Sequence, residues 1–258
     1  MNLQVLVSTM NQKDHKLIEK MNLQSDAIII NQCNVNKFEQ IDFNGNRIDF
    51  ISLNERGIGL SRNNALMRST AEICIFADED VEYVDNYKEL ITDAFKLKPD
   101  ADVIVFNVPS KNLNRPTYKI KKHSRVRWFN CLRYGAVKIA IRTDRLKMSN
   151  IYFSLLFGGG APYSCGEDSL FISDCIKKGL KVYADPRVIG YVRQDESSWF
   201  NGYTDKYFID KGILYSCLSK KFAKLLAIQF VIRHRRLFEK EKKWNEALQL
   251  MIQGIKSV

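Results

Sequence analysis

Three consecutive acids, Asp78, Glu79 and Asp80, directly follow the apolar run 73–76. Acids placed this close together repel one another, so the arrangement is costly unless a positive group lies beside them. A divalent cation bound by carboxylate oxygens would supply that charge and could also hold a diphosphate. The alternative is an ordinary turn of solvated acids, which the sequence does not exclude.

A second pair of acids, Glu167 and Asp168, follows Gly166 at the start of a predicted helix over 169–178. Acids in the first turn of a helix suit the positive end of its dipole, which explains the pair without any chemistry. It does not explain the glycine-rich run 157–161 just before them, a loop through which backbone can approach a ligand closely. An acid at this place could serve as a general base.

A third segment, residues 55–66, is a glycine loop that enters a helix predicted over 61–70 and carrying Ser61, Arg62 and Asn63 in its first turn. Helix N-termini and arginine side chains both suit phosphate. The glycine spacing matches neither a Walker loop nor the dinucleotide fingerprint. A capped helix start with a surface arginine remains the alternative. The polar and aromatic residues 194–200 are interpreted as a loop.

The elements that must position these side chains alternate along the first 110 residues. Short apolar strands separated by helices of about ten residues indicate a doubly wound parallel sheet with both faces covered. In that architecture ligands bind beyond the carboxyl ends of the strands, where these acids are expected. The predicted strands are 3–9, 27–31, 48–51, 73–76 and 103–106, and the predicted helices are 11–21, 61–70 and 87–97.

Two basic segments stand out from a mildly acidic body. The 258 residues carry a formal charge of +11, and residues 111–147 hold twelve Lys/Arg with one acid, whereas 216–258 hold ten with three. Such segments favour an anionic partner: phosphates, a nucleic acid or an anionic membrane surface. The composition, 45% hydrophobic and 27% charged, excludes a disordered chain, a collagen-like fibre and a polytopic membrane protein.

The six cysteines show neither a CxxC pair nor zinc-ligand spacing. Cys33, Cys74 and Cys175 lie among apolar residues, which predicts buried thiols in a reducing compartment. No signal peptide is visible before the first strand, and no apolar run approaches the ~20 residues of a spanning helix. We therefore expect a cytoplasmic protein, or one peripheral to the inner face of the cell membrane.

Taken together and in this order, the segments resemble a family 2 glycosyltransferase of the GT-A fold. The resemblance is carried by the strand end at 8–10, the loop and helix 59–66, the DxD-type acids 78–80 and the acidic motif 166–168. Residues 157–160 are similar to the acceptor-side loop of that family, which makes Gly159 a substrate contact. The resemblance covers residues 1 to about 212.

The resemblance implies an α/β fold, a Rossmann-like α/β/α sandwich with a mostly parallel sheet. We expect the GT-A catalytic domain over 1–215 and a basic, amphipathic, helical extension over 216–258. It also implies an enzyme that is an inverting hexosyltransferase or a related glycosyltransferase, dependent on Mn²⁺ or Mg²⁺. Its donor would be a nucleotide sugar, most simply a UDP-sugar, and its acceptor a glycan or a lipid-linked molecule of bacterial surface-polysaccharide or glycoprotein assembly.

Residue by residue, Asp78 and Asp80 match the acids that contact the ribose and the metal-bound diphosphate, with Asp80 the better metal ligand. Asp168 matches the catalytic base of inverting members, with Glu167 beside it. Thr9 and Arg62 fall where the nucleotide is held.

The sequence departs from the family pattern in three places. Asn31 stands where many members hold the nucleoside with an acid. Many members also have a late histidine as a metal ligand, and here Arg193 or Gln194 occupies that region, so Gln194 is the expected third ligand. The QxxRW motif of processive members is missing, which argues against a processive polysaccharide synthase.

Two other classes of function compete with this interpretation. A nucleotidyltransferase shares an α/β fold and paired acids, but residues 8–11 are not the basic glycine-rich signature expected near its N-terminus. A non-enzymatic nucleic-acid-binding module would suit the sequence pI of about 9.3, yet the body is acidic and no such motif is present; nucleic acid is therefore not an expected partner.

The segment 216–258 interleaves basic and apolar residues at helical spacing. Such a helix can lie on an anionic bilayer. It can equally pack its apolar side on the catalytic domain, or on a second subunit in a homo-oligomer. The basic residues of 111–147 are inserted between the catalytic motifs and are expected to serve the active site.

Overall fold

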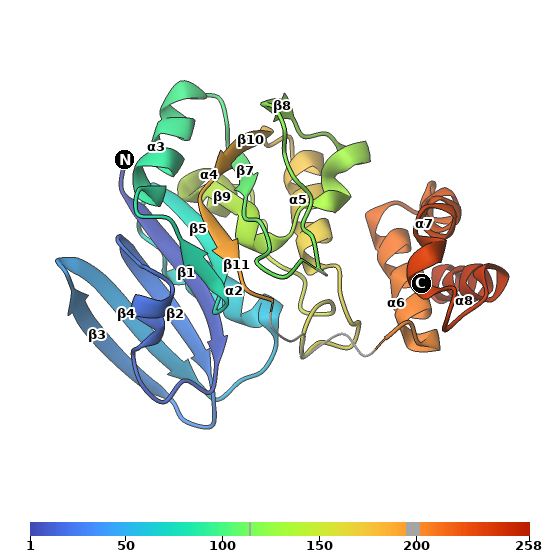
Figure 1. Cartoon of the computed structure of the whole chain (residues 1–258), viewed down its shortest axis with the longest axis horizontal. Helices are drawn as coiled ribbons and strands as arrows, with labels where there is room; N and C mark the ends of the chain where they lie inside the picture. The colour runs from blue at the N-terminus through green and yellow to red at the C-terminus, as the bar shows by residue number, and fades with distance from the viewer. Residues whose placement is uncertain (114, 195–201) are drawn as a thin grey trace.

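A mixed sheet of nine strands forms the centre of the protein (Figure 1). The computed structural model describes residues 1–113, 115–194 and 202–258. Across the sheet the strands run in the order β3 (Lys37–Phe43), β4 (Asn46–Leu53), β2 (Asp26–Gln32), β1 (Leu3–Met10), β5 (Ile73–Asp78), β9 (Ile139–Arg142), β7 (Val103–Asn107), β10 (Val182–Val188) and β8 (Ser124–Arg125). The predicted α/β fold with a mostly parallel sheet is confirmed.

The central strands are buried on both faces because helices cover both sides of the sheet. β1 pairs in parallel with both β2 and β5, and its residues are almost all buried apolar side chains until Ser8 and Thr9. Continuous apolar runs of this kind are typical of parallel strands without a solvent face. The register places Ser8 opposite Asp78 and Thr9 opposite Asn31, so polar side chains gather at one edge of the sheet.

The helices that cover the sheet are α1 (Leu17–Lys20), α2 (Ile58–Arg68), α3 (Tyr87–Leu97), α4 (Thr143–Met148) and α5 (Glu167–Lys177). The prediction for 87–97 is confirmed, and α2 and α5 begin two or three residues earlier than predicted. The predicted helix 11–21 is wrong, because it shrinks to the single turn α1. Asn11 has a φ of 54°, and a hydrogen bond from the Gln12 amide to Asn31 Oδ1 holds the chain in a loop.

Several parts of the sheet structure are not predicted by the sequence, among them the antiparallel strands β8 and β9. β3 forms a hairpin with β4 at the edge of the sheet, and its polar, largely exposed residues lack an apolar run. β6 (Val81–Tyr83) pairs with β11 (Gly190–Val192) in a separate two-stranded sheet. This small sheet matters for the site, because the Val81–Val192 pair brings Gln194 next to Asp80.

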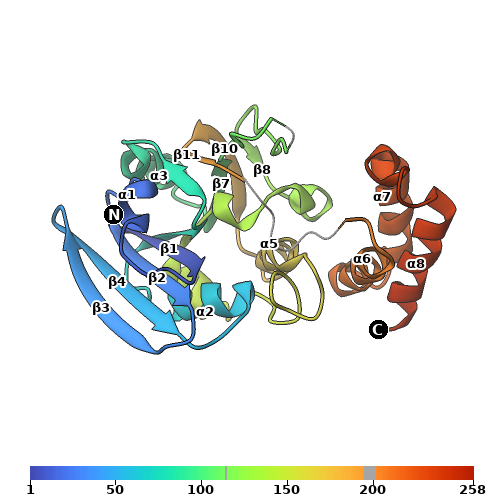
Figure 2. The same ribbon diagram turned by 60° about the horizontal axis from the view of Figure 1, so that its bottom comes forward.

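The C-terminal region is a bundle of α6 (Asp205–Leu218), α7 (Ala223–Phe238) and α8 (Trp244–Lys256), which stands beside α5 at one end of the molecule (Figures 1 and 2). Sequence patterning predicts helix from Cys217, but the first helix begins at Asp205 and the chain turns twice after it. A Cβ on Gly212 would lie 2.0 Å from the Met251 carbonyl oxygen, and one on Gly254 would lie 2.1 Å from that of Ile209. Glycine at both positions therefore lets α6 and α8 pack backbone against backbone.

The bundle has its own hydrophobic core, with Phe208 and Phe238 fully buried at its centre. α6 runs across the predicted boundary at 215/216; the division into two domains stays a prediction. None of the helices within the described residues is long and apolar enough to cross a membrane. Cys74 and Cys175 are buried as predicted, whereas Cys33 is only partly buried.

Candidate active site

A cavity of about 370 Å³ opens at the carboxyl ends of β1 and β5. Its walls come from the two strand ends, the start of α2, the glycine loop before α5 and the residues that follow β11. Most of the side chains are polar, as expected of a site that binds a charged ligand. The lining residues are Ser8, Thr9, Met10, Gln32, Ile58, Arg62, Asp78, Glu79, Asp80, Arg115, Gly159, Glu167 and Gln194.

Arg62 links the two acidic motifs in this cavity. Its guanidinium donates from Nη2 to both carboxylate oxygens of Asp78, at 2.9 and 3.1 Å, and from Nη1 to Glu167 Oε1 at 2.9 Å. The Arg62 side chain is only 4% exposed and lies over the ring of Phe153. Burial opposes its charged form, but the two carboxylates outweigh that cost and raise the pKa of Arg62. Arg62 is therefore not the surface arginine of the alternative interpretation, but a buried side chain that stays charged.

Asp80 lies beside this network, and among the described residues it forms no ion pair with a cationic side chain. Its Oδ2 accepts a 3.3 Å hydrogen bond from the Gln194 backbone amide. Burial, and next the charge of Asp78, raise the pKa of Asp80. A carboxylate whose ionised form is disfavoured in this way gains most from a cation placed against it.

Gln194 supplies the second feature of a cation site. Its φ of 52° is left-handed, and its side-chain Oε1 is buried without a hydrogen-bond partner among the described residues. Within those residues no group of three or more His, Cys, Asp and Glu side chains is close enough to hold a metal. Asp80 and Gln194 together nevertheless fit a hard divalent cation, because carboxylate and amide oxygens are its usual ligands and phosphate oxygens can complete its shell. Asp78, the other predicted ligand, is shared with Arg62.

Thr9 lies in a small polar cluster at the rim of the cavity. Its hydroxyl donates to Glu79 Oε2, and Gln12 Nε2 donates to the same carboxylate oxygen at 2.9 Å. Asn31 lies behind this cluster and does not line the cavity. It is 1% exposed, and its amide is fully engaged with the Gln12 backbone and with Ser52. Asn31 therefore shapes the loop after β1, and its contact with the substrate stays a prediction.

The glycine loop closes tightly over the start of α2. Ile58 N donates to the Gly159 carbonyl oxygen at 2.9 Å, so this amide of the helix N-terminus is already occupied. Gly158 has a φ of +101°, and a Cβ there would lie 2.6 Å from Ile58 Cγ2 and 2.8 Å from the Glu167 carboxylate. Only glycine allows the loop to lie this close to Glu167. Asn63 makes two hydrogen bonds with the Phe153 backbone, four residues before this loop.

The neighbouring acids of α5 face different surroundings. Glu167 lines the cavity and pairs with Arg62, whereas Asp168 does not line it. Asp168 Oδ1 accepts a 2.6 Å hydrogen bond from Ser169 N, and its Oδ2 lies 3.7 Å from where a Cβ of Gly135 would be. Burial, and next the negative charge of Glu167, raise the pKa of Asp168 to about 6. At neutral pH this side chain is a carboxylate of unusual basicity, which suits a general base.

Several lining residues are not identified by the sequence patterns. Gln32 Nε2 donates to the Gly57 carbonyl oxygen at 3.0 Å and lines the cavity in place of Asn31. Arg115 comes from the basic segment 111–147 and brings a positive charge to the cavity. The positive charge of that segment indicates an anionic ligand. The sequence does not, however, distinguish Arg115 from the other basic residues of the segment.

Comparisons with known proteins show the family and the fold of the chain. The family model "Glycosyl transferase family 2" matches residues 25–154. The fold is similar to S. aureus TarS 1-349 in complex with UDP-GlcNAc, with a TM-score of 0.68, 18% identity and coverage of 99% of this chain and 82% of that one. For the complex of the same protein with UDP, the TM-score is 0.66 and the identity 18%, with coverage of 98% of this chain and 81% of that one. For the protein without a named ligand, the TM-score is 0.65 and the identity 17%, with coverage of 99% and 81%. The sequence has no significant match among curated proteins.

Proposed function

Because the chain belongs to glycosyl transferase family 2, we propose that it moves a sugar from a UDP-sugar to a hydroxyl group of a glycan or lipid-linked acceptor, with inversion at the anomeric carbon. One observation carries the proposal. The buried Arg62 joins Asp78 to Glu167 at the strand ends, directly beside the side-chain oxygens of Asp80 and Gln194 that could bind a cation. The similar fold of TarS, whose structures include complexes with UDP-GlcNAc and UDP, supports a uridine donor.

The donor half of the site follows from its charges. Asp78 and Thr9 lie at the ends of paired strands and would hold the nucleoside by hydrogen bonds, with Gln32 beside them. Arg115 and the edge of Arg62 would face the diphosphate, since arginine forks match phosphate oxygens. Gly159, from the loop expected on the acceptor side, lines the cavity and would contact the substrate there.

Mn²⁺ or Mg²⁺ fits the oxygens of Asp80 and Gln194, with Asp78 as a shared neighbour. When bound, such a cation spreads the negative charge of the diphosphate and makes it a better leaving group. The positive charge of the cation would favour the ionised form of Asp80, which would then be its ligand. Arg62 holds Glu167 and Asp78 in place through its two ion pairs.

The acceptor half centres on Asp168. An acceptor hydroxyl is a poor nucleophile at neutral pH, and a carboxylate within reach can take its proton as the oxygen attacks the anomeric carbon. Asp168 adjoins the donor-side acid Glu167 without lining the donor cavity, so the acceptor hydroxyl would lie between Asp168 and the donor sugar, on the Gly135 side. Attack from the face opposite the diphosphate in a single displacement inverts the anomeric configuration.

A thermal-shift comparison of nucleotides tests the proposal. A UDP-sugar with Mn²⁺ is expected to stabilise the protein more than GDP-sugars, ADP-sugars or ATP do. The Asp80→Ala variant should lose the part of this stabilisation that depends on Mn²⁺. The Asp93→Ala variant, which removes an exposed acid from α3, should keep it. Stabilisation by ATP with Mg²⁺ and not by any UDP-sugar would favour the nucleotidyltransferase, and stabilisation by oligonucleotides only would favour the nucleic-acid-binding module.

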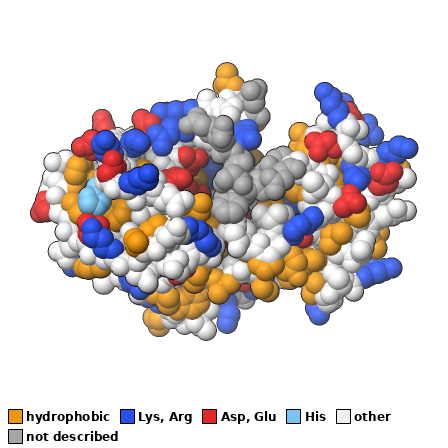
Figure 3. All heavy atoms as spheres, turned by 90° about the horizontal axis from the view of Figure 1, so that it is seen from below, with side chains coloured by type: hydrophobic (Ala, Val, Ile, Leu, Met, Phe, Trp, Pro, Cys, Tyr) orange, Lys and Arg blue, Asp and Glu red, His pale blue; other side chains and the backbone are white. Residues whose placement is uncertain are grey.

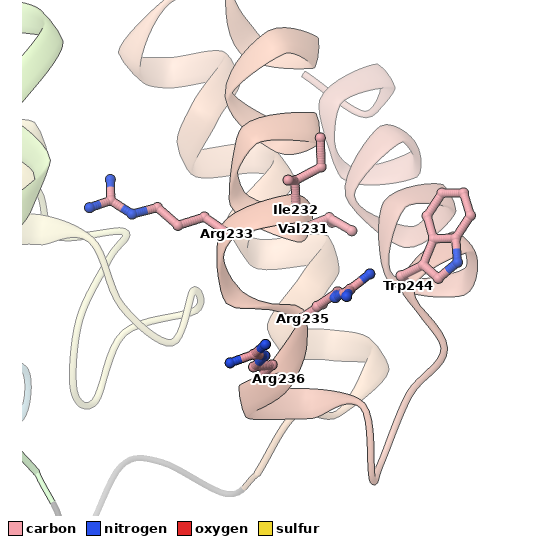
Figure 4. Close-up of a pocket in the computed structure, with 6 residues that line it drawn as sticks. All are labelled: Val231, Ile232, Arg233, Arg235, Arg236 and Trp244. Atoms are coloured by element: carbon pink, nitrogen blue, oxygen red, sulfur yellow. The ribbon is translucent and has the colours of Figure 1, made fainter.

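The outer face of α7 supports a location at an anionic membrane surface, which we propose as part of this function. Leu225, Ile228 and Ile232 lie three and four residues apart on one face and are 62%, 42% and 71% exposed. In Figure 4, Arg235 and the exposed Trp244 of α8 border the same side, and Figure 3 shows lysines and arginines around the outside of the bundle. Exposed apolar side chains ringed by cations match a bilayer of anionic lipids.

A further inference from the structure

A second cavity, of about 330 Å³, lies between the C-terminal bundle and the short helix η1 (Trp128–Arg133). We refer to it as the cation cleft, because three of its lining side chains are Arg133, Lys211 and Arg233. Of the described residues that line it, none is Asp or Glu. The cleft therefore joins the two basic segments that the charge pattern singled out, one contributing η1 and the other α7.

Two of the three cations of the cleft, Arg133 and Lys211, contact neutral groups. Arg133 donates to the Tyr118 hydroxyl at 3.1 Å and stacks on its ring. Lys211 contacts the sulfur of Cys165 at 3.6 Å and lies over the Phe230 ring. Among the described residues, no ion pair involves Arg133, Lys211 or Arg233. Burial, and next the charges of Arg233 and Lys211, also lower the pKa of His234 on the same wall, as expected in a positive field.

Aromatic rings form the remaining wall of the cleft, contributed by Tyr118, Trp128 and Phe230. Flat aromatic faces pack against the apolar faces of sugar rings or polyol chains, and the guanidinium fork of arginine binds phosphate oxygens. A wall of this composition suits a ligand that combines a hydroxylated carbon framework with a phosphate.

The cleft lies on the acceptor side of the proposed base. Successive residues of an α-helix point about 100° apart, and Glu167 faces the donor cavity while Asp168 faces Gly135, two residues beyond η1. Lys211 of the cleft also contacts the sulfur of Cys165, which lies three residues before Asp168 in the chain. A ligand in the cleft would thus extend toward Asp168 from the side opposite the donor.

We propose that the cation cleft binds a phosphate group carried by the acceptor, so that the acceptor substrate is a phosphorylated glycan, polyol or lipid carrier. This inference rests on the proposed function in one respect, that the phosphate-bearing ligand is the acceptor substrate. The binding of phosphate depends only on the residues of the cleft.

The experiment measures equilibrium binding by calorimetry. The probes are maltotriose, maltotriose phosphate and farnesyl diphosphate, each added to protein saturated with UDP and Mn²⁺ so that the donor cavity is filled. Maltotriose phosphate or farnesyl diphosphate is expected to bind at least 10-fold more tightly than maltotriose, and inorganic phosphate should compete. Whichever of the two binds tighter identifies the phosphate source, glycan or lipid carrier.

Two variants on one helix locate the site. Arg233 and Arg235 are both exposed residues of α7, but Figure 4 shows them pointing to opposite sides, with Arg233 away from Trp244. Arg233→Gln should weaken binding of the phosphorylated probe about 10-fold, the size of one charge-assisted hydrogen bond. Arg235→Gln makes the same change in net charge and should leave the affinity within about twofold of the wild type.

Three results would overturn the inference: equal affinity for maltotriose and its phosphate, an equal loss in both variants, or tight binding of single-stranded RNA with the same dependence on Arg233, which would mark a general polyanion surface. The proposed function is judged separately by UDP-sugar binding to the wild-type protein. Absence of UDP-sugar binding with retained, Arg233-dependent phosphate binding would refute the proposed function and leave the phosphate site standing.

Discussion

Replacing Asp168 by Asn should lower activity and raise stability together. The two side chains have nearly the same shape, and asparagine Oδ1 can still accept the hydrogen bond from Ser169 N, which spans 2.6 Å in the wild type. Asparagine cannot take a proton at neutral pH. Sugar transfer should therefore fall by roughly 10²–10⁴, the usual contribution of a positioned general base. Donor binding should persist, because its contacts lie on the other acids.

The change in stability follows from the pKa of Asp168, which burial and Glu167 raise from 3.8 to about 6. The folded protein binds the proton more tightly than the unfolded chain, so the free energy of unfolding falls as pH rises from about 4 to 6 and stays low above it. The shift of about two units corresponds to at most about 3 kcal/mol. The asparagine side chain carries no charge to desolvate, so the variant should be more stable at pH 7 by about 1–3 kcal/mol. For a chain of this size that is a rise in melting temperature of roughly 2–12 °C.

The assay combines three measurements on wild type and Asp168→Asn: transfer to an accepted acceptor, calorimetry of UDP-sugar binding, and melting temperature between pH 4 and 8. In the wild type, kcat/KM should decline about tenfold per pH unit below pH ~6, as the base becomes protonated. Near-normal turnover of the variant would refute the assignment of the base. If the difference in melting temperature between the two proteins is the same at every pH, the argument that Asp168 is a partly buried acid of raised pKa is refuted.

Other perturbations address the donor cavity and the outer surface. Asp80→Ala should abolish most of the Mn²⁺-dependent heat of UDP binding in calorimetry, and an unchanged affinity would remove Asp80 from the cation site. Arg62→Gln leaves two carboxylates facing each other in a buried network and should cost about 3–5 kcal/mol, which denaturant unfolding can measure; a loss below about 1 kcal/mol, the size expected of an exposed pair, would contradict the burial argument. Gly158→Ala should destabilise the protein by about 2 kcal/mol or more and weaken donor binding, whereas Gly45→Ala, which also has a positive φ of 76° but nothing within 4 Å of its Cβ, should cost about 1 kcal/mol and leave the donor unaffected. Ile232→Ser should reduce cosedimentation with phosphatidylglycerol vesicles severalfold; a change in oligomeric state in place of vesicle binding would show that this face contacts a second copy of the chain.

The predictable part of the fold came from short, continuous apolar runs. Strands such as 27–31 and 73–76 are buried on both faces, so nearly every residue in them must be apolar, and a short window of sequence contains the full signal. β3 carries no such signal, because an edge strand is stabilised by its partner β4 and not by burial of its own side chains. The short α1 was overpredicted for a related reason: the residues before it follow helical spacing, but their polar groups hydrogen-bond across to Asn31 and keep the chain in a loop.

The residues of the candidate site also divide into those that the local sequence indicates and those that it does not. Polar residues placed directly after apolar strands are positioned by the sheet, since parallel strands end at a common edge, and this singled out Asp78 and Asp80 from local sequence. Thr9 was singled out by the family resemblance. Arg115 and Gln32 reach the cavity through loops whose paths depend on distant contacts, so no local spacing revealed them.

What the sequence by itself determined was the kind of chemistry: paired acids after strands, a basic segment between motifs, and a family resemblance that the comparisons support. Only the tertiary structure decided which charges meet. Arg62 could have been a surface cation, yet the sheet and the glycine loop bring Asp78 and Glu167, 16 and 105 residues away, to opposite edges of one buried guanidinium. Such pairings follow from the packing of whole elements, because the energy of a buried charge depends on every group around it and on none of its sequence neighbours in particular.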